Sequence, residues 1–115
     1  PQARAAFEEA LALCRVEATR DPGPGAARNL AIALERLGDV RARQGDLSGA
    51  LAAFGQAGAV LRPVLDADPR VGPALALVRS RESNVLVSRG DLARAVEVRE
   101  EAVALQRAHL AAQPE

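Results

Sequence analysis

The sequence predicts an all-α protein, an α-solenoid built from antiparallel helix hairpins that repeat along the chain. Three observations predict it: the composition, clusters of helix-breaking residues at regular intervals, and an internal repeat with a period of 45 residues. Ala, Leu and Val supply most of the apolar residues, whereas Tyr, Trp, Met and Lys are absent and only Phe7 and Phe54 are aromatic. This composition favours closely packed helices over sheets.

Helix-breaking residues divide the chain into segments of similar length. Proline and glycine cluster with aspartate at residues 21–25 and 66–73, and Gln113-Pro114 follows near the end. Gly45-Asp46 and Gly90-Asp91 divide the two long intervals between these clusters. The remaining segments carry apolar residues at helical spacing and predict five helices, over residues 2–20, 25–44, 47–67, 73–89 and 92–112.

The triplets Gly45-Asp46-Leu47 and Gly90-Asp91-Leu92 predict tight turns between consecutive helices. Glycine adopts the left-handed conformation at low cost and lets the preceding helix end without strain. The aspartate that follows it can accept hydrogen bonds from the free amides of the next helix. We expect the leucine of each triplet to pack the new helix against the old one.

The repeat extends through both helices of each pair. When residues 30–69 are moved forward by 45 positions, identical residues coincide, among them Leu30 with Leu75, Val40 with Val85, Ala50 with Ala95, Ala57 with Ala102 and Pro69 with Pro114. A partial copy precedes them, in which Phe7 coincides with Phe54. The chain is therefore predicted to be one domain, residues 1–115, of about two and a half repeats: a trailing half repeat over 1–22 and whole repeats over 23–69 and 70–115.

These residues resemble a known family. The pattern Leu34-x-x-Leu37-Gly38, Gly45-Asp46, Ala50, Phe54, Ala57 and Asp68-Pro69 is similar to the tetratricopeptide repeat (TPR), and in particular to its longer bacterial variants. The resemblance implies hairpins that stack into a superhelix. Three positions depart from the family pattern: Arg41 stands where a large aromatic residue is usual, Ser83 corresponds to Gly38, and Arg99 corresponds to Phe54.

Small residues recur on the second helix of each predicted pair. Ala50 and Ala57, like Ala95 and Ala102, are seven residues apart, where a short side chain lets the first helix approach closely. We expect Phe54 to fill the gap between hairpins and to be buried.

Composition and motifs argue against several classes of function. The 15 acidic and 15 basic residues balance, so no global field attracts the chain to nucleic acid or to an anionic membrane. No apolar run approaches the length that spans a bilayer. The single cysteine, Cys14, cannot form an internal disulfide, which indicates a cytoplasmic, reducing environment.

Catalytic and metal-binding constellations are not evident in the sequence. His109 is the only histidine and has no second His or Cys at metal-ligand spacing. Cys14 lies at helical spacing from Phe7 and is interpreted as a buried small hydrophobe. Glu8-Glu9 and Glu100-Glu101 are interpreted as solvated helix faces. We therefore expect neither enzyme activity nor a cofactor.

The class of function that remains is the recognition of a protein or peptide partner. Stacked hairpins form a concave surface from the first helix of each pair, which would carry Ile32 and Leu77 among its residues. The polar residues predicted to bind a partner there are Glu35, Asp39, Arg43, Arg81, Asn84 and Ser88. TPR domains that grip a C-terminal carboxylate use Lys, Arg and Asn on this face, so the resemblance suggests Asn84, Arg43 and Arg81 as counterparts. Glu35 and Asp39 oppose such a clamp.

Two hypotheses remain open from the sequence. The first is a module that binds a peptide or partner helix in the groove. The second is a spacer or self-association segment of a larger multidomain bacterial signalling or effector protein.

The two ends are predicted to differ. Helix 2–20 matches the second helix of a hairpin whose first helix is absent. Its apolar face is therefore expected to be uncovered and to cause weak self-association through the first helix. The last helix is more polar, with Arg99 in place of an aromatic, and is expected to be a C-terminal cap. On this interpretation the natural array extends upstream of Pro1 and ends near Glu115.

Overall fold

Five helices follow one another along the described part of the chain. The computed structural model describes residues 2–20 and 23–113, and no strand occurs among them. The helices are α1 (Gln2–Arg20), α2 (Pro24–Arg43), α3 (Leu47–Ala67), α4 (Gly72–Arg89) and α5 (Leu92–Ala112), with a short 3-10 turn, η1 (Pro69–Val71), between α3 and α4. The predicted bounds agree to within one residue at each end, and η1 is the one element that was not predicted.

Some side chains of α1 are not described. They include those of Ala3, Ala6, Phe7, Ala10 and Cys14. The predicted packing of Phe7 and Cys14, and the apolar face expected to drive pairing through the first helix, therefore lie outside the described residues.

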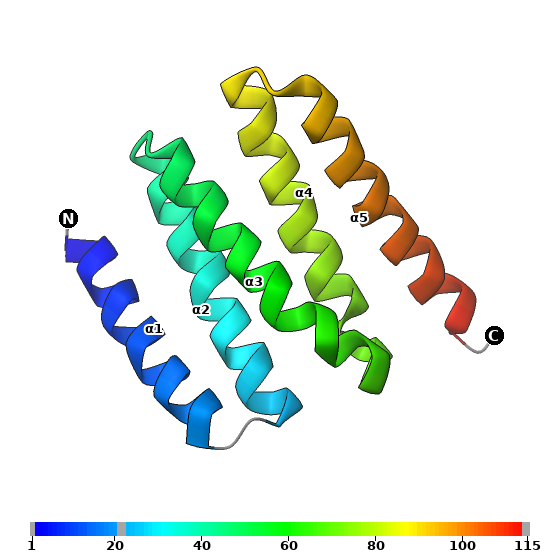
Figure 1. Ribbon diagram of the computed structural model, residues 1–115, viewed down its shortest axis with the longest axis horizontal. Helices are drawn as coiled ribbons and strands as arrows, with labels where there is room; N and C mark the ends of the chain where they lie inside the picture. Colours follow the sequence, from blue (N-terminus) through cyan, green and yellow to red (C-terminus); the bar gives the residue numbers. More distant parts are fainter. Residues whose placement is uncertain (1, 21–22, 114–115) are drawn as a thin grey trace.

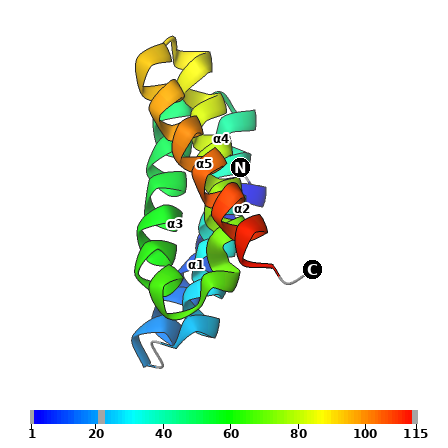
Figure 2. The same ribbon diagram turned by 90° about the vertical axis from the view of Figure 1, so that its right-hand side faces the viewer.

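Each helix packs antiparallel against the next one in the chain (Figure 1). The α2–α3 hairpin contacts the α4–α5 hairpin through α3 and α4, while α1 packs on α2. The molecule measures 46 × 39 × 20 Å, and its thin dimension equals about two helix diameters. Figure 2 shows the two layers, with α3 on one side and α2 and α4 on the other.

The two Gly-Asp turns form as predicted at their glycines. Gly45 and Gly90 have φ values of 81° and 84°, in the left-handed region. The carboxylate of Asp46 accepts a hydrogen bond from the Gly49 amide at 3.0 Å and caps α3. Asp91 occupies the same position before α5 but makes no such cap.

The leucines after these turns behave differently. Leu47 packs against the core, whereas Leu92 is 60% exposed. The predicted packing of Leu92 is therefore wrong. Leu47 is covered because α3 packs against both α2 and α4, whereas α5 is the last helix of the described chain and has a neighbour on one side only.

The centre of the core is the contact between Phe54 of α3 and Gly38 of α2. Phe54 is 1% exposed, and a Cβ atom placed on Gly38 would lie 2.5 Å from its ring. Only a residue without a side chain lets the ring lie against the helix backbone at this point. Four alanines were predicted to let neighbouring helices approach closely, and all four are buried: Ala50, Ala57, Ala95 and Ala102.

The second hairpin meets the same geometric requirement with different residues. Ser83, the counterpart of Gly38, is buried, and its hydroxyl donates to the Ala95 carbonyl at 2.9 Å. Arg99, the counterpart of Phe54, is exposed. Because no aromatic ring fills this site, a serine side chain fits and binds α4 to α5 through its hydroxyl.

Charged residues replace leucines in the interior of the second hairpin. Arg79 and Glu82 correspond to the buried Leu34 and Leu37, and they pair at 2.7 Å. Glu101 of α5 also contacts the Arg79 guanidinium, at 3.5 Å, and Arg62 of α3. Glu101 is therefore only partly exposed, in contrast to the solvated face expected for it, whereas Glu100 is exposed as expected.

Asp68 caps the turn that links the hairpins. Its carboxylate accepts hydrogen bonds from the Arg70 backbone amide at 3.2 Å and from Arg70 Nε at 2.9 Å. The hydrogen bond from the Arg70 guanidinium lowers the pKa of Asp68, although burial of the carboxylate acts in the opposite direction.

Truncation of Phe54 tests the core contact. We expect Phe54→Ala to lower the free energy of unfolding by about 3–5 kcal/mol, because it leaves a cavity over Gly38. Its repeat counterpart provides the control: Arg99→Ala, at an exposed position, should change stability by about 0.5 kcal/mol or less. Urea unfolding followed by circular dichroism at low protein concentration measures both. Equal effects of the two changes would contradict the packing described.

The Asp68–Arg70 pair predicts an acid dependence of stability. Because the folded-state pKa is lowered, the carboxylate stabilises the fold at pH values above its ordinary pKa, and this contribution disappears as the pH falls through the folded value. Asp68→Asn should therefore lower the urea midpoint at neutral pH and reduce the difference between neutral and acidic pH. The exposed Asp66→Asn is the control. An unchanged acid dependence in Asp68→Asn would refute the prediction.

Candidate functional site

The first helices of the two hairpins, α2 and α4, lie side by side on one side of α3 (Figure 2). The six residues predicted to bind a partner lie on these two helices: Glu35, Asp39 and Arg43 on α2, and Arg81, Asn84 and Ser88 on α4. The face that these helices form together, called here the α2–α4 face, is the candidate site.

Arg81 joins the two helices. Its Nη1 atom lies 2.9 Å from Asp39 Oδ1 and 3.0 Å from Oδ2, and its Nε atom lies 3.1 Å from Glu35 Oε1. The Arg81 side chain is 38% exposed, and the carboxylates are more deeply buried. One guanidinium thus bridges two acidic residues from the neighbouring hairpin and fixes the spacing of α2 and α4.

The other three predicted residues do not join this cluster. Asn84 and Arg43 are exposed, and no ion pair of Arg43 is seen within the described residues. The Ser88 hydroxyl donates to the Asn84 carbonyl at 3.2 Å, a bond within α4. The structure therefore brings together Glu35, Asp39 and Arg81, and leaves Arg43, Asn84 and Ser88 apart.

An apolar hollow lies beside the Arg81 cluster. Ile32 of α2 and Leu77 of α4 are 46% and 45% exposed, and they line a cavity of about 150 Å³. The other lining residues are Arg28, Ala31, Glu35, Leu61, Ala74 and Val78. A cavity of roughly this volume holds one small ring or branched aliphatic group.

The hollow has polar groups at its rim. Glu35 lines it and also contacts Arg81, so the hollow and the charged cluster form one continuous surface. Glu35, Asp39 and Arg81 together carry one excess negative charge, whereas Arg28 contributes a positive charge to the hollow. Sequence reasoning placed Ile32 and Leu77 on this face but not Arg28, Ala74 or Val78. The available signal was helical spacing, because Arg28 lies four residues before Ile32 and Ala74 lies three residues before Leu77.

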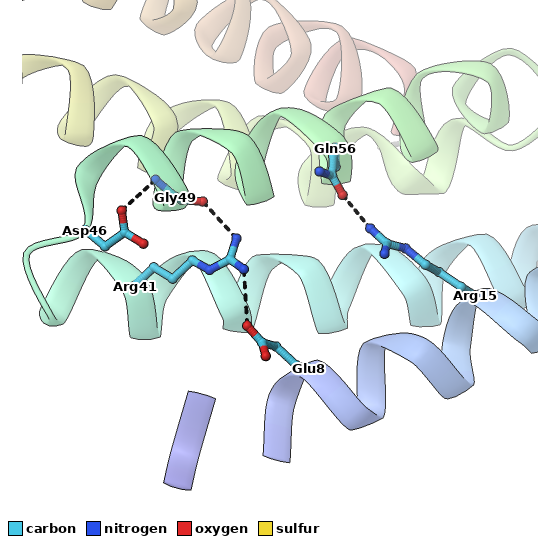
Figure 3. A network of polar contacts seen from close by, with 6 residues as sticks. All are labelled: Glu8, Arg15, Arg41, Asp46, Gly49 and Gln56. Atoms are coloured by element: carbon cyan, nitrogen blue, oxygen red, sulfur yellow. Dashed lines mark hydrogen bonds and ion pairs between the residues drawn. The ribbon is translucent and has the colours of Figure 1, made fainter. Parts of the chain in front are cut away.

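A second, more polar cleft lies between α1 and the α2–α3 hairpin, and Figure 3 shows the polar contacts between these helices. Its volume is about 290 Å³. Arg41 donates to the Gly49 carbonyl at 3.2 Å and to Glu8 at 3.4 Å, and Arg15 donates to Gln56 at 2.6 Å. Arg41 of α2 thus connects three helices, because it donates to α3 and to α1.

Among the described residues, 2–20 and 23–113, no group of three or more His, Cys, Asp or Glu residues could hold a metal ion. None of the helices in these ranges combines the length and apolarity that crossing a bilayer requires.

Comparison with protein families, curated proteins and solved structures gave no significant match to this chain.

A double-mutant cycle tests the Arg81 bridge. We expect Arg81→Gln and Asp39→Asn to be coupled by about 1 kcal/mol or less in the free energy of unfolding, the range of a partly exposed ion pair. The control cycle combines Arg81→Gln with Glu9→Gln on α1, and these two changes should be additive. Equal coupling in the two cycles would show that Arg81 does not stabilise the contact between α2 and α4.

Proposed function

We propose that this chain is a protein-interaction module, a TPR-like α-solenoid whose α2–α4 face binds a peptide or a partner helix. On this proposal the two hairpins continue one superhelix, and the α2–α4 face is its concave surface. The observation that carries the proposal is the apolar hollow between Ile32 and Leu77, open beside a charged cluster.

The repeat and the packing support the solenoid. The period of 45 residues places equivalent turns at Gly45 and Gly90, and the helices pack mainly on their neighbours in the chain. Contacts between neighbours alone are typical of repeat proteins. The close contact of Phe54 with Gly38 supports the same interpretation, since the TPR pattern carries small and aromatic residues at these positions.

The chemistry of the face favours one class of ligand. An aliphatic side chain fits the hollow. A basic side chain at the end of the face near Glu35 and Asp39 would be attracted by their carboxylates, which outnumber Arg81, whereas Arg28 carries a positive charge at the hollow itself. An apolar centre with a polar rim is the usual anatomy of an interface. A C-terminal carboxylate is disfavoured, because Arg81 is already paired with two carboxylates.

Selection from a displayed library of short random peptides tests the function. We expect enriched peptides to share an aliphatic residue close to Arg or Lys. Leu77→Glu should weaken binding of an enriched peptide by about tenfold or more, because it places a charge in the hollow. Fluorescence anisotropy with the labelled peptide measures the affinity.

The matched control is Val87→Glu, an exposed apolar position of the same helix outside the hollow. It should leave the affinity unchanged. If no peptide is enriched, or if enriched peptides bind the Leu77→Glu variant as well as the parent chain, the proposed binding function is wrong.

A further inference from the structure

The outer face of α5 is an apolar surface that no described helix covers. Figure 1 shows α5 at one end of the row of helices. Val96, Val103 and Leu110 are 56%, 36% and 66% exposed along this face. A hollow of about 410 Å³ runs beside them, lined by Val96, Arg99, Glu100, Val103, Ala104 and Arg107. This hollow is larger than the one on the α2–α4 face.

The internal repeat indicates that this face is built to pack against another helix. Val96 and Val103 stand 45 residues after Leu51 and Gly58 of α3. Leu51 packs on the apolar cluster of the second hairpin, and Gly58 lies against the Arg79 guanidinium of α4. The equivalent positions of α3 are thus in a helix–helix contact, whereas those of α5 are exposed.

The apolar residues of the α5 face are symmetric about Val103, and an acidic and a basic residue flank it at nearly equal distances. Val96 and Leu110 are each seven residues from Val103, in opposite directions along the helix. Glu100 lies three residues before Val103, and Arg107 lies four residues after it. With 3.6 residues per turn, both charges fall on the same side of the apolar row, at nearly equal distances from Val103. Arg99, which also lines the hollow, falls on the other side of the row. The flank with Glu100 and Arg107 is therefore complementary to its own reverse.

We propose that two copies of this chain associate through the α5 faces, with the two α5 helices antiparallel about a two-fold axis near Val103. In this arrangement Val96 of one copy faces Leu110 of the other. Glu100 of each copy faces Arg107 of the other, so the ion pair forms twice. Such an interface uses the same patch on both subunits, as a two-fold dimer requires.

The charges determine the orientation. In a parallel pair of α5 helices, Glu100 of one copy would lie level with Glu100 of the other and about 10 Å along the axis from Arg107, so the opposite charges could not pair. The antiparallel arrangement brings Glu100 and Arg107 of different copies together along one flank of the valines, whereas Arg99 lies along the other flank. This surface is distinct from the first helix, through which the sequence predicted self-association, and it does not depend on the proposed peptide binding.

Charge reversal tests this pairing. The 115-residue chain is compared with Glu100→Arg, Arg107→Glu and the double variant by sedimentation velocity over a concentration series. Each single reversal should raise the dimer dissociation constant by about tenfold or more, because two attractive pairs become repulsive. The double variant should restore the parent's dissociation constant. An equimolar mixture of the two single variants should form a heterodimer, since each copy then supplies the charge that the other lacks.

Glu97→Arg on the same helix is the control, because Glu97 does not line the hollow. It should leave the dissociation constant unchanged. Circular dichroism checks the fold of each variant. If a reversal lowers the helix content, Glu100→Gln and Arg107→Gln replace it, each with a smaller loss of dimer.

Several results would overturn the proposal. A parent chain that stays monomeric at every concentration would leave the α5 face without this partner. A dimer that Leu13→Glu on α1 dissociates and Glu100→Arg does not would place the interface on the first helix. Loss of the dimer in both single variants, without recovery in the double variant or the mixture, would exclude the antiparallel arrangement.

Discussion

The contact between Phe54 and Gly38 is the constraint on which the other contacts of this fold depend. The ring occupies the space that a side chain at residue 38 would need. The helices α2 and α3 therefore pack so closely that the Phe54 ring contacts the backbone of α2. With α3 held in this way, α4 also packs on α3, on the same side as α2, and comes to lie beside α2. Arg81 can then reach Asp39 and Glu35, which belong to a different hairpin. The candidate site thus results from a core contact in which none of its own residues takes part.

The second hairpin shows that the same backbone arrangement can be held by different chemistry. Ser83 and Arg99 replace the glycine and phenylalanine together, and Arg79 and Glu82 replace two buried leucines. Buried charges are costly unless they are paired, and here Arg79 contacts both Glu82 and Glu101. An ion network tolerates fewer alternative arrangements than an apolar core, because every partner must keep its place. We expect the second hairpin to depend on correct register more than the first one does.

Local features were predictable from the sequence, and contacts between hairpins were not. Gly45, Gly90 and Asp46 act within a few residues of themselves, so the turns and helix bounds followed from local chemistry. The helical period also placed Glu35 and Asp39 on one face, and Arg81 was predicted to lie near it. Their ion pairs depend on the distance between α2 and α4, which the repeat does not encode. The exposed Leu92 and the inward Glu101 were missed for the same reason, since both outcomes depend on which neighbouring helix is present.

The α2–α4 face and the α5 face share no residue, so both surfaces could be occupied at the same time. Helices in this chain contact mainly their neighbours, so a partner on one surface need not displace a contact on the other. Two copies paired through α5 would present two α2–α4 faces related by a two-fold axis. A ligand with two recognition segments would then bind the second face at a high effective concentration once it had bound the first. Weak binding by one shallow hollow of about 150 Å³ would become strong binding in the pair, without any new contact in either site.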